Sequence, residues 1–240
     1  MISIVVPTYN EEKILDEMLR QFDGIKSEPF ELIVSDNKSE DDTVKLARRH
    51  TNKIVLNNDI SRFTIGVARN RGVEIAQNPI IMFVDVGVQI PNIEDFMEHI
   101  ANHFKKNPKC AAMTVRLGVT KKHATFWDKL IFGVIDKWFW ISNNFFKRGL
   151  SHGKFMAVRA EAFRKIGGFD AKLAAGEDVD LFSRLAKVGD TFFDRSLIVF
   201  HSARRAHKYG WPKLLFIWAI NGISVLFFKR STSKEWKDVR

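Results

Sequence analysis

The chain has 240 residues and a formal net charge of +10, with 45% hydrophobic and 28% charged residues. This composition excludes bulk disorder, and the length suits one sizeable domain or a domain with an appendage. The single cysteine, Cys110, excludes an internal disulfide, and no apolar signal core precedes Ile2, so we expect a cytoplasmic protein.

The first half of the chain alternates short apolar runs with segments of helical periodicity. The runs begin at Ile4, Leu32 and Ile80 and predict buried strands, with a further short strand near residues 53–56. Helices are predicted over residues 11–22, from 43 to about 48, and over 66–77, the first of them capped by Asn10. This alternation favours a parallel sheet with right-handed crossovers.

The second half is less regular. It predicts helices over residues 92–106, 124–146 and 176–188, and strands near residues 110–117, 153–158 and 191–200. The whole chain therefore predicts an α/β fold, with a mostly parallel central sheet flanked by helices.

Polar side chains follow the three main strands, at residues 8–11, 36–38 and 85. Ligands of open parallel sheets bind at the carboxyl ends of the strands, so we expect these residues to share one site.

The turn after the first strand lacks the Gly-x-Gly-x-x-Gly pattern whose backbone amides bind a diphosphate. It carries Glu11 and Glu12, which repel phosphate, so we expect this turn to hold a neutral base edge, with Asp36 accepting a base N–H. The phosphates then need cations from elsewhere. The candidates are Lys38, Arg62, Arg69 and a metal near Asp85.

Basic and aromatic residues gather in two segments. Residues 121–150 hold six Lys and Arg against two acids, residues 201–240 hold nine against two, and all six tryptophans lie in these segments. Such a mixture is typical of a surface that meets anionic lipid headgroups. A buried aromatic core with a basic rim stays open as the alternative. Nucleic acid is not expected as a partner, because the apolar runs are long and no nucleic-acid motif is recognisable.

The apolar run from Leu214 to Phe228 is bounded by basic residues. Fifteen helical residues reach about 22 Å, short of the roughly 30 Å hydrocarbon core of a bilayer. We therefore expect peripheral docking on the inner face of the cell membrane rather than a single span. The predicted division is a catalytic domain over residues 1–205 and a membrane-associating segment over 206–240.

Five motifs stand in a fixed order along the chain. They are Val5-Val6-Pro7-Thr8-Tyr9-Asn10-Glu11, Asp36-Asn37-x-Ser39-x-Asp41-x-Thr43, Gly66-x-Ala68-Arg69-Asn70-x-Gly72, the strand-ending Asp85, and Gly176-Glu177-Asp178. In this order, over roughly residues 2–200, the chain resembles family 2 glycosyltransferases. The resemblance implies the GT-A fold, a nucleotide-sugar donor, and transfer to a saccharide or lipid-linked acceptor with inversion at the anomeric carbon.

The resemblance also implies roles for single residues. Pro7, Thr8, Glu11 and Asp36 would hold the nucleobase and ribose, Arg69 would lie near the donor, and Asp85 would meet the diphosphate. The full set of expected donor-binding residues is Pro7, Thr8, Tyr9, Glu11, Asp36, Lys38, Arg69 and Asp85.

The expected catalytic residues are Asp178, as the general base, and its neighbour Glu177. Transfer to a hydroxyl needs a base within hydrogen-bond reach of the attacking oxygen. Carboxylates at a helix start also serve as caps, and this structural interpretation is the alternative.

The expected cofactor is a divalent cation, Mg²⁺ or Mn²⁺, at Asp85. The family pairs two aspartates around one residue, whereas Gly87 stands in the second position of this chain. His201 follows a predicted strand and is the expected further ligand. A histidine that closes the strand and bonds to the backbone is the alternative.

Two other functions stay open at the sequence level. A polyprenyl phosphate acceptor is already ionised and would need no base. A nucleotide-sugar or lipid-binding scaffold with weak catalysis draws support from Gly87. A nucleotidyltransferase is disfavoured, because no Gly-rich phosphate loop with a lysine lies near residue 10.

Overall fold

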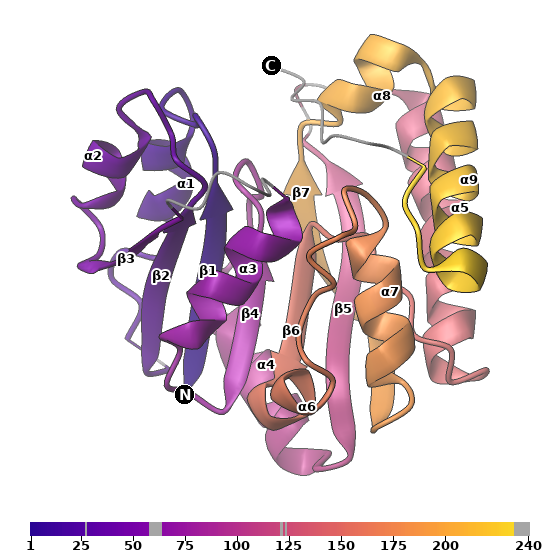
Figure 1. Ribbon diagram of the computed structural model, residues 1–240, viewed down its shortest axis with the longest axis horizontal. Helices are drawn as coiled ribbons and strands as arrows, with labels where there is room; N and C mark the ends of the chain where they lie inside the picture. The colour runs from indigo at the N-terminus through magenta and orange to yellow at the C-terminus, as the bar shows by residue number, and fades with distance from the viewer. Residues whose placement is uncertain (27, 58–63, 121, 123, 233–240) are drawn as a thin grey trace.

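The structure is a computed structural model that describes residues 1–26, 28–57, 64–120, 122 and 124–232. Its centre is one seven-stranded sheet with the strand order β3-β2-β1-β4-β6-β5-β7 (Figure 1). The strands are β1 (Ile2–Thr8), β2 (Phe30–Asp36), β3 (Lys53–Leu56), β4 (Ile80–Val84), β5 (Cys110–Val119), β6 (Phe155–Arg159) and β7 (Asp190–His201).

The sheet is parallel except at one strand. β1 pairs in parallel with β2 and β4, β2 with β3, and β5 with β7, whereas β6 runs antiparallel between β4 and β5. The predicted mostly parallel sheet is confirmed. Because β6 runs backwards, the residues just before it lie at the carboxyl end of β4.

Nine helices are described around this sheet. They are α1 (Leu15–Arg20), α2 (Thr43–Ala47), α3 (Ile65–Glu74), α4 (Ile93–Lys106), α5 (Phe126–Asn144), α6 (Ala160–Lys165), α7 (Glu177–Leu185), α8 (Arg204–Tyr209) and α9 (Trp211–Phe228). Figure 1 shows α3, α6 and α7 on the near face of the sheet and α4 behind it, with α5 and α9 at the edge formed by β7.

Two apolar cores fill the space between the sheet and its helices. Successive residues of β1 point to opposite faces of the sheet, so Ile4 and Val6 lie in one core and Val5 lies in the other. The first core includes residues of α1, α4 and α5, and the second includes residues of α3, α6 and α7. Burial on both faces explains why the parallel strands are continuous apolar runs in the sequence.

The first helix differs from the sequence prediction. It begins at Leu15 rather than at residue 11, and the prediction that Asn10 caps it is wrong. Asn10 has a positive φ of 51°, and its side-chain oxygen accepts a hydrogen bond from the Glu40 N–H, 2.7 Å away. This polar bond to the loop after β2 holds residue 10 outside the helix.

Periodicity missed two of the short helices, α6 and α8. α6 and α8 have six residues each, too few for a periodic pattern. The longer α5 was predicted and has a capping box, in which Thr125 and Asp128 exchange side-chain to backbone hydrogen bonds.

Candidate active site

The carboxyl ends of β1 and β2 meet through a buried pair of polar side chains. Thr8 and Asp36 are register partners, and the Thr8 hydroxyl donates a hydrogen bond of 2.8 Å to the Asp36 carboxylate. The backbone N–H and the hydroxyl of Ser39 also donate to this carboxylate, at 2.7 and 2.6 Å. Asp36 therefore fixes the loop after β2, and the predicted contact between these two strand ends is present.

Arg69 is the buried centre of the site, with 1% of its surface exposed. It extends from α3 and donates to Asp85 at 2.7 Å, to Glu177 at 2.9 Å and to the Gly153 carbonyl at 2.8 Å. Burial would lower the pKa of Arg69, but the charges of Asp85 and Glu177 outweigh burial and raise it. The guanidinium thus stays charged and joins β4, α7 and the segment before β6.

Asp85, directly after β4, is bonded through both of its carboxylate oxygens. Arg69 contacts one oxygen, and the Lys154 ammonium lies 3.0 Å from the other. Burial would raise the pKa of Asp85, but the charges of Lys154 and Arg69 lower it below its ordinary value. Asp85 is therefore an ionised carboxylate between two cations.

Lys154 was not predicted as a site residue. It stands one position before β6, which pairs antiparallel with β4 through Val84 and Phe155. This pairing sets Lys154 beside Asp85. A lysine preceding an apolar strand was the only signal in the sequence, and it gives no information about the strand's partner.

Asp178 lies in the first turn of α7, against the backbone of Gly153. A Cβ at Gly153 would stand 2.8 Å from the Asp178 Oδ2 atom, and Gly153 has a positive φ of 74°. Burial, followed by the negative charge of Glu177, raises the pKa of Asp178 to about 7. A carboxyl group that titrates near neutrality is suited to accept a proton.

A cavity of about 150 Å³ opens at these strand ends. Four of the predicted residues line it, namely Pro7, Glu11, Asp85 and His201. The rest of the lining is formed by Ile65, Val86, Gly87, Phe132, Lys154, Ser202, Ala203, Arg204, Arg205, Ala206, Leu214 and Trp218. Residues on both sides of the predicted domain boundary at position 205 therefore line the same cavity.

His201 ends β7 and lines this cavity. Its Nδ1 atom accepts a hydrogen bond from the Ala203 N–H at 3.2 Å, while the buried Nε2 atom has no hydrogen-bond partner within the described part of the chain. Burial, followed by the positive charge of Lys154, lowers the pKa of His201 to about 3. The ring is therefore neutral, which allows Nδ1 to act as the acceptor.

The remaining predicted residues lie at the rim or outside the described part of the chain. Tyr9 is 50% exposed, and Lys38 is exposed with a positive φ of 61°. Glu11 lines the cavity and donates its backbone N–H to the Thr43 hydroxyl at 2.7 Å. Arg62 lies outside the described residues.

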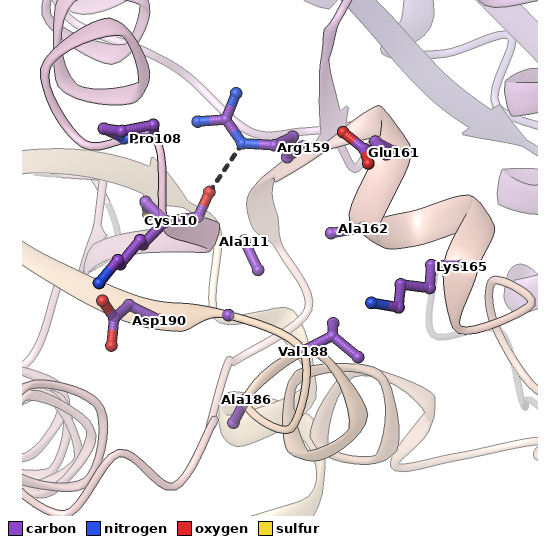
Figure 2. Close-up of a pocket in the computed structure, with 12 residues that line it drawn as sticks. Pro108, Cys110, Ala111, Arg159, Glu161, Ala162, Lys165, Ala186, Val188 and Asp190 are labelled. Atoms are coloured by element: carbon purple, nitrogen blue, oxygen red, sulfur yellow. Dashed lines mark hydrogen bonds between the residues drawn. The ribbon is translucent and has the colours of Figure 1, made fainter.

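A second cavity of about 430 Å³ lies at the opposite, amino ends of β5 and β7 (Figure 2). Arg159 crosses it and donates a hydrogen bond to the Cys110 carbonyl at 3.1 Å. The same guanidinium also bonds the carbonyls of Phe104 and Asn107, so its role is structural. None of the predicted site residues lines this cavity.

Helices α5 and α9 carry a large exposed apolar surface, which we call the aromatic face. Its members on α5 are Phe126, Trp127, Leu130, Val134 and Trp138, and its members on α9 are Leu215, Phe216, Trp218, Ile220, Ile223, Leu226, Phe227 and Phe228. Among the described residues, the 18-residue α9 is the one helix long and apolar enough to cross a membrane, and 17% of it is buried. The alternative of a buried aromatic core does not fit these helices.

Comparison of this sequence with family models and with known proteins identifies the family of the chain. A sequence model described as glycosyl transferase family 2 matches residues 3–167. The O-antigen chain rhamnosyltransferase WbaN of Salmonella anatum is 25% identical over 214 residues, which cover 86% of this chain and 66% of that protein. Validoxylamine A glucosyltransferase of Streptomyces hygroscopicus subsp. limoneus is 33% identical over 94 residues, 37% of this chain and 20% of that protein.

Comparisons by structure show the fold. A mannosyltransferase from Pyrobaculum calidifontis, in complex with GDP-Man and Mn²⁺, superposes with a TM-score of 0.71 at 18% identity, covering 95% of this chain and 63% of that one. Glucosyl-3-phosphoglycerate synthase of Mycobacterium tuberculosis, with Mg²⁺ and UDP, gives 0.62 at 17% identity, covering 94% and 78%. The expected GT-A fold is confirmed.

Proposed function

This chain belongs to glycosyl transferase family 2, and we propose that it transfers a sugar from a nucleotide-diphospho-sugar to a saccharide or lipid-linked hydroxyl at a membrane surface, with inversion. The observation that carries the proposal is the buried Arg69, which bonds both Asp85 and Glu177 and so sets Asp178 beside the strand ends. The chain spans only about a fifth of the length of the validoxylamine A glucosyltransferases it matches, so its substrates are proposed from its own site.

The donor nucleoside is proposed to lie over the ends of β1 and β2. The Glu11 carboxylate in the turn there suits the N–H and O–H groups of a base and a ribose, while the buried Asp36 holds the turn through Thr8 and Ser39. Tyr9 and Lys38 stand at the exposed rim, within the same turns. The diphosphate is proposed to extend from there into the cavity lined by Asp85 and Lys154.

Asp178 is proposed to act as the general base. The acceptor hydroxyl gives its proton to the Asp178 carboxylate while its oxygen bonds to the anomeric carbon. The bond from that carbon to the diphosphate oxygen breaks on the opposite face, and the nucleoside diphosphate leaves with the electron pair. A pKa of about 7 keeps a large fraction of Asp178 ionised at neutral pH, which favours a hydroxyl acceptor over a polyprenyl phosphate.

The residues at Asp85 do not fit a divalent cation. Such an ion normally takes several oxygen ligands, but position 87 is a glycine and both oxygens of Asp85 contact cationic side chains. The Nδ1 atom of His201 already accepts the Ala203 N–H, and its Nε2 atom is buried. No group of three or more candidate metal ligands occurs among the described residues. No step is therefore assigned to a metal.

The aromatic face is proposed to dock on an anionic membrane. Exposed lysines accompany it, with Lys129 and Lys137 on α5 and Lys213 on α9. Aromatic side chains with basic neighbours suit the boundary between headgroups and acyl chains. Because Leu214 and Trp218 of α9 also line the cavity, docking would bring a lipid-linked acceptor near the donor.

A donor panel tests the proposed function. The purified chain is incubated with sugars activated by UDP, GDP, CDP, ADP and dTDP, with vesicles and candidate acceptors, and the release of nucleoside diphosphate is measured. Release with at least one donor, and a product of inverted anomeric configuration by NMR, are expected. No release with any donor would support the binding scaffold instead.

A further inference from the structure

Lys154 lines the cavity at the strand ends and pairs with Asp85. We propose that the Lys154 ammonium neutralises the diphosphate, and that donor binding by this chain requires no divalent ion. This inference rests on the proposed function, because it concerns the donor of that reaction.

The first support is the placement of the charge. The Nζ atom of Lys154 lies 3.0 Å from Asp85 Oδ2, where an ion bound by that carboxylate would otherwise lie. About a third of the Lys154 side chain is exposed, and the residue lines the cavity. The ammonium has three donors, so one bond to Asp85 leaves others for phosphate oxygens. A divalent ion at the same oxygen would be repelled by this lysine.

The second support is how Lys154 is held in place. Arg69 is buried and already bonds Asp85, Glu177 and the carbonyl of Gly153, the residue before Lys154. The backbone N–H of Asp85 in turn donates to the Lys154 carbonyl at 3.1 Å. Lysine and aspartate are therefore fixed to each other through both backbone and side chain, so the ammonium is preorganised before the donor arrives.

The third support is Gly87, the position at which a second carboxylate is absent. Gly87 has a positive φ of 84°, a conformation in which L side chains are strained. The cavity lining carries the cations Lys154, Arg204 and Arg205 against the carboxylates Glu11 and Asp85. The charge that a diphosphate needs is therefore present in the lining itself.

Nucleotide binding to the full chain tests this inference. Affinities of UDP, GDP, CDP, ADP and dTDP, and of the matching monophosphates, are measured by calorimetry in EDTA and again with Mg²⁺ or Mn²⁺. We expect a nucleoside diphosphate to bind in EDTA, with less than a roughly threefold change on adding either ion. Lys154→Met should lower the affinity for the nucleoside diphosphate roughly 10- to 100-fold, which is the effect of losing one hydrogen bond to a charged group. The same substitution should lower the affinity for the matching monophosphate by a smaller factor.

Two further variants complete the test. Lys154→Arg keeps the charge and should retain most of the affinity, whereas Lys106→Met removes an exposed lysine at the end of α4 and should have no effect. Thermal unfolding verifies that each variant is folded. The Lys154 variants are expected to fold because Asp85 keeps its bond to Arg69.

The outcomes separate the inference from the proposed function. Diphosphate binding only in the presence of added ion, or equal affinity of Lys154→Met and the native chain, would overturn the role of Lys154 alone. No binding of any nucleoside diphosphate in either buffer would overturn the proposed function, and the role of Lys154 with it.

Discussion

Arg69 and Asp85 form a buried ion pair with 2.7 Å between the guanidinium and the carboxylate. They come from α3 and from the end of β4, and the same guanidinium reaches Glu177 at the start of α7. One buried side chain thus assembles three segments that are distant in the sequence. The geometry of the proposed donor site depends on this contact.

Removing the guanidinium should destabilise the fold. Arg69→Met would remove the cation that the buried Asp85 and Glu177 share and would leave Asp85 with Lys154 alone, which costs about 3–5 kcal/mol of unfolding free energy. Urea unfolding measures this difference. Arg71→Met is the matched control, because Arg71 is on the same helix and pairs with Glu74 at the surface, and its loss should change stability by about 0.5 kcal/mol or less. Equal effects of the two variants would contradict the role of Arg69.

Gly153 should tolerate no side chain. Gly153→Ala would place a Cβ 2.8 Å from Asp178 Oδ2 and force a positive φ on alanine, at a cost of about 1–2 kcal/mol for the backbone alone. It should also displace Asp178 and lower the transfer rate. Gly133→Ala in α5 is the control, because the added Cβ would meet no described atom within 4 Å beyond its own stretch of helix, and it should stabilise the helix by about 0.5–1 kcal/mol. A Gly153→Ala variant with native stability and rate would count against the contact.

The transfer rate should rise with pH through the titration of Asp178. Its pKa is raised from 3.8 to about 7, so the carboxylate that accepts the proton predominates only above about pH 7. Stability should change in the opposite direction. Because the folded state binds this proton more tightly than the unfolded state, the contribution of Asp178 to stability is lost as pH rises from 3.8 through about 7. A pH–rate profile that is flat between pH 5 and 8 would argue against a titrating base.

Binding to anionic vesicles should depend on the aromatic face and its lysines. Lys129→Gln on α5 should weaken binding roughly fivefold, since a basic residue near such a surface contributes about 1 kcal/mol. Phe227→Glu, at a side chain that is 77% exposed, should reduce it further. Leu56→Glu, an exposed apolar residue on β3 at the other edge of the sheet, is the control. Co-sedimentation at several salt concentrations measures these effects, and equal binding by all three variants would remove the membrane assignment.

The sequence predicts the strand ends well, because they depend on local patterns. Apolar runs, turn signals and motif order place Thr8, Asp36 and Asp85 at one edge of a parallel sheet, and the structure brings Thr8 and Asp36 into contact. Arg69 contacts Asp85 at the end of β4, and its expected place near the donor stays a prediction.

The parts that periodicity missed depend on pairing between distant segments. Lys154 reaches Asp85 because β6 runs antiparallel to β4, and no local pattern near residue 154 specifies that direction. Leu214 and Trp218 line the cavity because Trp211 donates a hydrogen bond to the buried Asp128 of α5 at 2.8 Å, which anchors the start of α9. The expected metal site was inferred from a motif of which only Asp85 remains.

The assignment of Asp178 as the base is tested most directly by the turnover of Asp178→Asn with a donor and an acceptor. The amide keeps the shape of the side chain but accepts no proton, so the rate should fall about 10²- to 10⁴-fold. The affinity for the nucleoside diphosphate should be unchanged, and above pH 7 the variant should be at least as stable as the native chain, because the unfavourable buried charge is gone. Asp180→Asn is the control on the same helix, since Asp180 pairs with Arg184 and Lys229, and it should lower stability with little effect on the rate of the folded enzyme. A native turnover rate in Asp178→Asn would contradict the account.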